Sequence, residues 1–167
     1  MQTRTRAALK DDAETIAAIY NEGIAERSST FETDPRSAAE VLAWLGSDRQ
    51  PVLVAAAAGS PAGWARVALY SPRPCYAGVG EASVYVASAH RGRGIGRELA
   101  VELVAAAERA GYHKLVGKLF TDNEASRRLV ARLGFREVGT HLRHSRLDGH
   151  WRDVVLVELL LGDAAAA

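Results

Sequence analysis

A run of glycines and arginines, Arg91-Gly92-Arg93-Gly94-Ile95-Gly96, stands between two patterned segments. The segment before it, residues 81–86, is rich in β-favouring residues, which predicts a strand. After it, apolar residues recur at helical spacing from Ile95 to Ala110, which predicts a helix. The start of a helix carries unpaired N–H groups and the positive end of the helix dipole, and glycine allows a ligand to come close. The run therefore predicts a strand–turn–helix unit that binds a pyrophosphate.

Two common phosphate-binding motifs do not match this run. A dinucleotide-binding fingerprint needs a third glycine where Arg97 stands, and a later carboxylate where the chain has Lys114 and Lys118. A P-loop needs Gly-Lys-Ser/Thr, which the sequence lacks. An ordinary turn with solvated arginines is the alternative, but the flanking strand and helix favour a binding site.

Length and composition limit the classes of protein that the chain can belong to. We expect one domain over residues 1–162 and a flexible tail at 163–167, because 167 residues with 48% hydrophobic content can bury one full core. The net charge of +1 argues against nucleic acid or a membrane surface as the main partner. Cys75 is the single cysteine, which fits a cytoplasmic protein, and no Cys and His cluster has the spacing of a metal site.

The remaining patterns predict alternating strands and helices. A capping box at Asp11 and Glu14 opens the first helix, and the second begins at Pro35 and ends at Gly46. A further helix is expected at 123–133, ended by Gly134. Strands are expected at 3–9, 51–57, 63–70, 81–86, 114–120, 136–142 and 153–160, with a turn at 58–62. This order predicts an α/β domain with a mixed sheet.

The loop motif, Arg/Gln-x-x-Gly-x-Gly between a strand and a helix, resembles the acetyl-CoA loop of the GNAT acetyltransferase superfamily. The order of elements over nearly the whole chain resembles the fold of that superfamily too. Within it, the sequence is most similar to the phosphinothricin acetyltransferases and to relatives that confer arsinothricin resistance. The similar stretches are Ile19–Gly23, Thr30–Pro35, Arg73–Tyr76, Glu81–Val86, Asn123–Ser126, Leu133–Phe135 and Leu147–Asp153.

The resemblance implies a mixed, mostly antiparallel sheet flanked by helices, and acetyl transfer from acetyl-CoA to a primary amine. It implies that the strand opens near Val84–Val86 to pair with the pantetheine arm. Asn123 corresponds to a side chain that contacts this arm, although it also suits the N-cap of its own helix. The residues expected to bind acetyl-CoA are Val84, Tyr85, Val86, Arg91, Gly92, Arg93, Gly94, Ile95, Gly96, Arg97, Asn123 and Ser126.

The expected chemistry needs a proton acceptor, because an amine is protonated at neutral pH and must lose a proton before it attacks the thioester. Glu81 is the candidate, since it begins the strand that leads into the glycine loop. The alternative is a solvated carboxylate at a strand end. Val130 stands where many relatives have tyrosine or histidine as a general acid, so we expect the thiolate to leave unprotonated.

The expected acceptor is a glutamate-like antimetabolite: phosphinothricin, arsinothricin or methionine sulfoximine. Arg73 would bind its anionic head group, with Tyr76 as a hydroxyl donor and Phe31 as an apolar wall. A solvated arginine and ordinary core aromatics are the alternatives. The resemblance also implies a homodimer. Another amine or a protein N-terminus as acceptor, and a non-catalytic acetyl-CoA-binding regulator, remain alternative functions.

Overall fold

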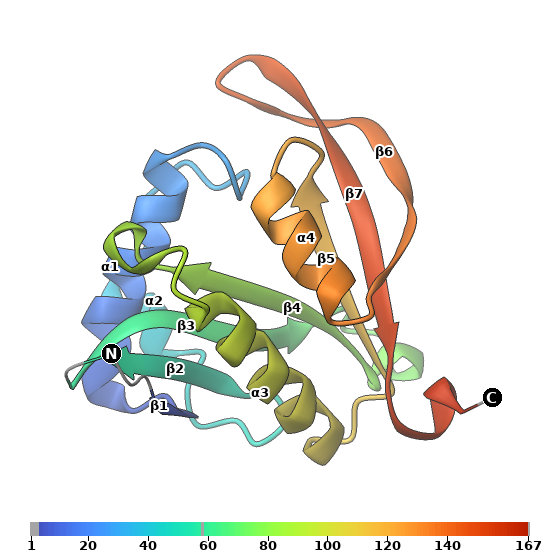
Figure 1. Cartoon of the computed structure of the whole chain (residues 1–167), viewed down its shortest axis with the longest axis horizontal. Coiled ribbons are helices and arrows are strands. Elements are labelled where there is room, and N and C mark those ends of the chain that lie inside the picture. The colour runs from blue at the N-terminus through green and yellow to red at the C-terminus, as the bar shows by residue number, and fades with distance from the viewer. Residues whose placement is uncertain (1–3, 58, 167) are drawn as a thin grey trace.

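The computed structural model describes residues 4–57 and 59–166 and contains one seven-stranded sheet in the order β1-β2-β3-β4-β5-β7-β6 (Figure 1). Neighbouring strands run antiparallel except for β4 and β5. The strands are β1 (Arg4–Ala7), β2 (Val52–Ala57), β3 (Ser60–Leu69), β4 (Val79–Val86), β5 (Lys114–Phe120), β6 (Arg136–Leu147) and β7 (His150–Leu160). The predicted mixed sheet is confirmed.

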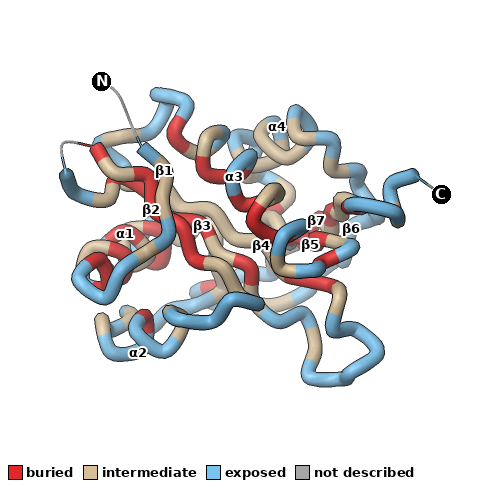
Figure 2. The backbone as a smooth tube through the Cα atoms, turned by 90° about the horizontal axis from the view of Figure 1, so that it is seen from below, coloured by how far each residue is buried: buried red, intermediate tan, exposed pale blue. Residues whose placement is uncertain are grey.

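Helices cover both faces of the sheet. Helices α1 (Ala13–Ala25) and α2 (Ala38–Leu42) lie on one face, and α3 (Ile95–Arg109) and α4 (Glu124–Arg132) lie on the other (Figure 2). Single 3-10 turns occupy Lys10–Asp12, Pro74–Tyr76, Ser88–His90 and Gly162–Ala165. Across residues 4–57 and 59–166, no helix combines the length and apolar character needed to cross a membrane.

The two larger apolar cores follow from the alternation of side chains along the strands. Under α3, the core joins Ala65, Val67 and Leu115 of the sheet to Leu99 and Leu103 of the helix. Under α1 and α2, it joins Val54 and Trp64 to Ile16, Ile19 and Val41. Successive residues of β2 and β3 therefore point to opposite cores, which fixes the register of the centre of the sheet.

The strands β4 and β5 part after a short stretch of pairing. Their parallel ladder joins Val79 to Lys114, Gly80 to Leu115 and Glu81 to Val116, and it ends there. Beyond this point β4 stays paired with β3 as far as Val86, while β5 stays paired with β7 as far as Phe120. An opening therefore begins in the middle of the sheet next to Glu81.

The predicted starts of the first two helices are wrong. A 3-10 turn precedes α1, and the acidic residue that caps this turn is Asp12 and not Asp11. Asp12 is buried, and its carboxylate accepts a 2.7 Å hydrogen bond from the Leu9 N–H and pairs with Arg6 at 2.6 Å. Hydrogen bonding to Arg6 lowers the pKa of Asp12. Helix α2 starts after Ser37, because the Ser37 hydroxyl caps the N–H of Glu40 and leaves Pro35 outside the helix.

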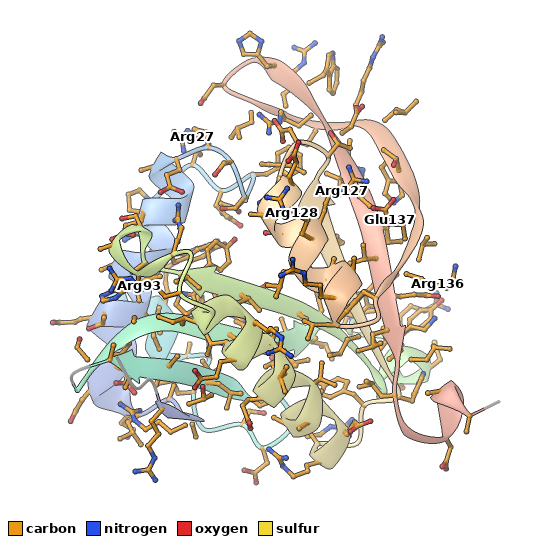
Figure 3. The ribbon with its side chains drawn as sticks, viewed as in Figure 1. Arg27, Arg93, Arg127, Arg128, Arg136 and Glu137 are labelled. Carbon is orange, nitrogen blue, oxygen red and sulfur yellow. The ribbon has the colours of Figure 1, made fainter. Side chains whose placement is uncertain are left out.

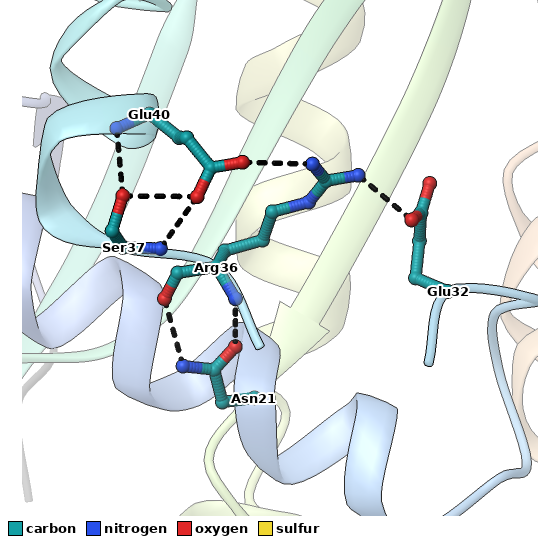
Figure 4. A network of polar contacts seen from close by, with 5 residues as sticks. All are labelled: Asn21, Glu32, Arg36, Ser37 and Glu40. Atoms are coloured by element: carbon teal, nitrogen blue, oxygen red, sulfur yellow. Dashed lines mark hydrogen bonds and ion pairs between the residues drawn. The ribbon is translucent and has the colours of Figure 1, made fainter. Parts of the chain in front are cut away.

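A polar network fixes the loop between α1 and α2 (Figure 4). The Asn21 side chain accepts from the N–H of Arg36 at 2.7 Å and donates to the Arg36 carbonyl at 2.9 Å. The Arg36 guanidinium pairs with Glu32 at 2.8 Å and with Glu40 at 2.9 Å. Hydrogen bonds from the Ser37 N–H and from Arg36 hold the pKa of Glu40 at about 2. The loop is thereby fastened to α1.

The other predicted elements agree with the structure apart from their ends. Strand β5 and the start of α3 lie where they are predicted, and β3 begins three residues early, at Ser60. The last hairpin is longer than predicted, because Asp148 and Gly149 both have positive φ (48° and 80°), as a tight two-residue hairpin turn requires. Thr3, Ala58 and Ala167 of the predicted first strand, turn and tail lie outside the described residues.

Candidate active site

A cavity of about 470 Å³ opens between β4, the start of α3 and the start of α4. Its lining residues, which define the β4–α4 cavity, are Glu26, Ser28, Ser29, Val84, Tyr85, Val86, His90, Arg91, Gly92, Gly94, Ile95, Gly96, Arg97, Asn123, Ala125, Ser126, Arg128, Leu129 and Arg132. The structure thus brings together all the residues that the sequence predicts for acetyl-CoA except Arg93. The Arg93 side chain lies on the side of its loop away from α4 (Figure 3).

The edge of β4 supplies free backbone groups to this cavity. The Ala87 N–H donates to the Ala62 carbonyl at 2.9 Å, so Ala62 and Ala87 form a hydrogen-bonded pair of the β3–β4 ladder. Pairs alternate along an antiparallel ladder, and the backbone groups of Val84 and Val86 therefore point away from β3, into the opening that β5 has left. The Val86 carbonyl accepts from Arg91 Nε at 3.0 Å, which leaves the Val86 N–H and both Val84 groups for a ligand.

The glycine loop adopts a conformation that only glycine takes without strain. Gly92 and Gly94 have φ of 75° and 84°, and α3 begins directly after Gly94. The Gly94 carbonyl accepts from the N–H groups of Arg97 and Glu98. The start of α3 thus faces the cavity with its positive dipole end, as an anion-binding site requires.

Several cavity residues are missing from the sequence prediction. Arg128 and Arg132 stand one helical turn apart on α4, and Figure 3 shows Arg128 on this helix. With Ala125 and Leu129 they form one stripe, so helical spacing counted from Asn123 could have identified them. His90 also lines the cavity, and its Nδ1 is buried without a hydrogen-bond partner among the described residues. These arginines and the free β4 edge suit a long, anionic, amide-containing ligand such as acetyl-CoA.

Asn123 has both of the roles open to an asparagine at a helix start. Its side-chain oxygen accepts from the Ser126 N–H at 3.1 Å, which makes it the N-cap of α4. Its amide nitrogen donates to the Ser28 carbonyl at 3.3 Å and so ties α4 to the loop after α1. The N-cap is thus confirmed, and because Asn123 also lines the β4–α4 cavity, its contact with the ligand stays a prediction.

Glu81 lies at the head of the opening, on the face of the sheet opposite to α3. Alternation along β4 places its side chain with those of Ser83 and Tyr85, whereas Ala82 and Val84 pack under α3. The Glu81 carboxylate is 2.8 Å from the ammonium of Lys118 on β5. The side chains of Glu81 and Lys118 are 32% and 45% exposed, so both remain open to a ligand.

Arg66 extends this polar face on the neighbouring strand, and we call Glu81, Lys118, Arg66 and Ser83 together the Glu81 face. Arg66 is paired with Ser83 across the β3–β4 ladder, and its guanidinium carbon lies 4.2 Å from the centre of the Trp44 ring. Burial lowers the pKa of Arg66. Within the described part of the chain, Arg66 forms no ion pair, so the positive charge of this half-buried side chain is left for a ligand.

Aromatic side chains form the floor beside this face. Tyr85 stacks on Trp64 at 4.8 Å between ring centres and meets the edge of Tyr20 at 4.9 Å. Burial raises the pKa of Tyr85 well above its ordinary value, so its hydroxyl stays protonated. Tyr85 is therefore a hydrogen-bonding and packing residue at any working pH.

The three residues predicted for the acceptor lie on two sides of Glu81. Phe31 packs on Phe120 at 4.8 Å between ring centres, four residues along β5 from the partner of Glu81. Arg73 and Tyr76 lie in the exposed turn before β4, where the guanidinium carbon is 5.6 Å from the centre of the Tyr76 ring. The structure thus brings Arg73 and Tyr76 together but places Phe31 apart from them.

Comparison with known proteins agrees with this arrangement. The sequence pattern of the acetyltransferase (GNAT) family matches residues 16–135. The chain is 34% identical to phosphinothricin N-acetyltransferase of Streptomyces coelicolor over 94% of this chain and 95% of that protein. It is 32% identical to the L-methionine sulfoximine/L-methionine sulfone acetyltransferase of Pseudomonas aeruginosa over 100% of this chain and 99% of that protein. The structure of the acetyltransferase yncA from Salmonella typhimurium with its cofactor acetyl-CoA superposes on this structure with a TM-score of 0.93. The two are 30% identical, and the superposition covers 98% of this chain and 96% of that one.

Proposed function

The chain belongs to the acetyltransferase (GNAT) family and is an acetyl-CoA-dependent N-acetyltransferase, and on that premise we propose that it acetylates the α-amino group of a small glutamate-like amino acid. Phosphinothricin, arsinothricin and methionine sulfoximine are the proposed acceptors. The observation that carries the proposal is the parting of β4 and β5 beside Glu81. It places a carboxylate between a cavity suited to acetyl-CoA and a polar face suited to an amino acid.

The residues of the β4–α4 cavity have separate roles in this proposal. The free groups of Val84 and the Val86 N–H pair with the amides of the pantetheine arm, as an added strand would. The glycine loop and the start of α3 bind the pyrophosphate, with Arg97 adding positive charge. Arg128 and Arg132 face the phosphate-bearing end of the ligand from α4.

Glu81 acts as the proton acceptor. Acetyl-CoA supplies an acetyl group activated as a thioester. Glu81 receives the proton of the acceptor ammonium, directly or through water, and the freed amine attacks the thioester carbonyl carbon. The new C–N bond replaces the C–S bond, CoA leaves as a thiolate, and the acylated nitrogen gives its second proton to water, so that the product is a neutral amide. Val130 on α4 offers no proton to this leaving group, and a thiol of ordinary pKa is a tolerable leaving group without one.

Charge on the Glu81 face supports an anionic acceptor. Glu81 is neutralised by Lys118, whereas Arg66 carries a charge without an ion-pair partner among the described residues. Arg73 and Tyr76 add a second cation and a hydroxyl at the start of β4, and Phe31 closes the other side. Two relatives are named for phosphinothricin and for methionine sulfoximine or sulfone, which are amino acids with oxygen-rich side-chain groups.

We further propose that the chain forms a homodimer in the cytoplasm. The last hairpin leaves large apolar side chains exposed: Val138, Leu142, Trp151 and Leu160, with exposed fractions from 41% to 75%. Strand β6 is exposed over nearly its whole length, as is typical of a surface covered by a second subunit. Light scattering of the purified protein measures the mass directly, and Leu142→Asp should halve it.

Acetyl-CoA-dependent release of free thiol tests the proposed function. The acceptors are phosphinothricin, arsinothricin, methionine sulfoximine, glutamate and a short peptide, each at several concentrations. Saturable turnover of one of the first three would support the proposal and rank the head groups. Turnover of the peptide alone would indicate a protein acceptor, and acetyl-CoA binding without any turnover would overturn the acceptor assignment.

A further inference from the structure

Lys118 projects into the opening between β4 and β5, and in the function proposed so far it only balances the charge of Glu81. It lies two residues past Val116, the last residue of β5 that pairs with β4, so β4 no longer flanks this part of the strand. Its ammonium contacts the Glu81 carboxylate at 2.8 Å. A primary ammonium therefore already occupies the place that the acceptor ammonium must take.

A second lysine on the same strand shows that this pair differs from a structural one. Lys114 lies on the same face of β5, at its paired end, and its ammonium is 2.9 Å from Glu158. Glu158 is only 12% exposed and also pairs with Arg136, so that network is closed. The pair of Glu81 and Lys118 is more exposed, and an exposed ion pair contributes little to folding stability. Opening it therefore costs the fold little.

We propose that Lys118 binds the carboxylate of the acceptor, so that the Glu81–Lys118 pair opens around an amino-acid zwitterion. The inference rests on the proposed role of Glu81. The acceptor ammonium bonds to Glu81, and the acceptor carboxylate, attached to the same carbon, bonds to Lys118. Two opposite charges are exchanged for two opposite charges, so neither protein group is left unpaired.

This exchange selects for one class of acceptor. An amine without a carboxylate can take Glu81 only by leaving Lys118 without a partner in a partly enclosed site, which costs binding free energy. Lys118 thus determines specificity for free α-amino acids over amines, amides and peptides. Arg66 faces Ser83, two residues farther along β4 than Glu81, and is left for the side-chain anion of the acceptor.

A comparison of acids with amides tests the inference. The Michaelis constants of phosphinothricin and of its α-carboxamide are measured by thiol release for the unaltered enzyme and for the variants Lys118→Gln, Lys118→Arg, Lys114→Gln and Arg66→Gln. We expect the unaltered enzyme to favour the acid by at least 30-fold. Lys118→Gln should raise the constant of the acid at least tenfold and change that of the amide less than threefold. Lys118→Arg should restore most of the preference.

The controls separate this inference from the proposed function. Lys114→Gln removes a lysine from the same strand and should keep the preference of the unaltered enzyme. Thermal unfolding of Lys118→Gln checks that the variant is folded. If Lys118→Gln turned over both acceptors with an unchanged preference for the acid, or if only Arg66→Gln lost that preference, the role of Lys118 would be overturned and the proposed function would stand. If the unaltered enzyme turned over none of the acceptors, the proposed function would fail and this inference with it.

Discussion

The two ends of β5 differ in their surroundings, and the difference separates stability from function. At the start, β4 and β7 flank the strand on both sides, Leu115 is fully buried and Lys114 is closed into a network with Glu158 and Arg136. At the end, β7 alone remains as a neighbour, and Lys118 is exposed towards the opening. Backbone and charged groups that have partners within the fold stabilise it. Those that lack a neighbouring strand are free to bind a ligand.

Strand β4 shows the same contrast along its own length. Val79 and Gly80 are buried between two strands, whereas Val84 and Val86 have β3 on one side and the β4–α4 cavity on the other. Unpaired backbone groups of a strand readily take up an extended ligand. The sheet thus creates its ligand site by ending one ladder early.

The largest expected effect comes from the carboxylate at the point where the strands part. Glu81→Gln should lower kcat at pH 7 by about 10²- to 10⁴-fold, the usual contribution of a general base, and leave acetyl-CoA affinity nearly unchanged. Thiol-release kinetics and calorimetric titration measure the two quantities. The control is Glu137→Gln. It removes an exposed carboxylate of the last hairpin, which pairs with Arg127 on α4. Equal turnover by both variants would remove Glu81 from the mechanism.

The glycine loop provides the next test. Gly94→Val puts a β-branched residue at a φ of 84°, where L residues are strained by about 1–2 kcal/mol, and we expect the Michaelis constant for acetyl-CoA to rise about tenfold. Gly46→Val introduces the same strain at a φ of 85°, away from the β4–α4 cavity. It should lower stability without changing that constant. A similar kinetic effect of both variants would mean that the loop acts through stability alone.

The closed end of β5 should affect stability and not activity. Bonding to Lys114 and Arg136 lowers the pKa of Glu158, so Glu158 stabilises the fold above its unfolded pKa of 4.5. This contribution is lost as the pH falls through the folded pKa. Glu158→Gln should cost about 1–2 kcal/mol of unfolding free energy at pH 7 and progressively less below pH 4.5. Urea unfolding at pH 7 and below pH 4.5 measures this cost. A cost that did not change with pH would contradict the stabilising role of the Glu158 carboxylate.

The smallest effect is expected at the start of α4. Asn123→Ala removes the N-cap and should cost about 1 kcal/mol, whereas Asn123→Ser keeps a capping oxygen and should cost less. If Asn123 also contacts the ligand, both variants should raise the Michaelis constant for acetyl-CoA, since serine cannot reach as far. An effect on stability alone would limit Asn123 to capping.

Local sequence was sufficient for most of the fold and for one side of the site. The glycine loop, the start of α3 at Ile95 and all of β5 follow from short-range patterns, because their signals do not depend on distant residues. The start of α2 was predicted wrongly, since Pro35 and Ser37 are both acceptable helix starts and the contact of Arg36 with Asn21 decides between them.

The polar face opposite α3 could not be derived from sequence in the same way. The Glu81–Lys118 pair depends on the parallel register of β4 and β5, which are separated by a whole helix in the chain. Where that ladder ends is a property of the assembled sheet. The exposed charge of Lys118 therefore had no local signal, and neither did the surplus charge of Arg66.

Amide hydrogen exchange of β4, measured residue by residue with and without acetyl-CoA, tests the central claim most directly. The Val84 and Val86 N–H groups point into the opening, so bound acetyl-CoA should slow their exchange at least tenfold. The Tyr85 N–H, which points to β3, should change little. If acetyl-CoA binds and the exchange of Val84 and Val86 stays the same, the unpaired edge of β4 is not the acetyl-CoA site and the account is contradicted.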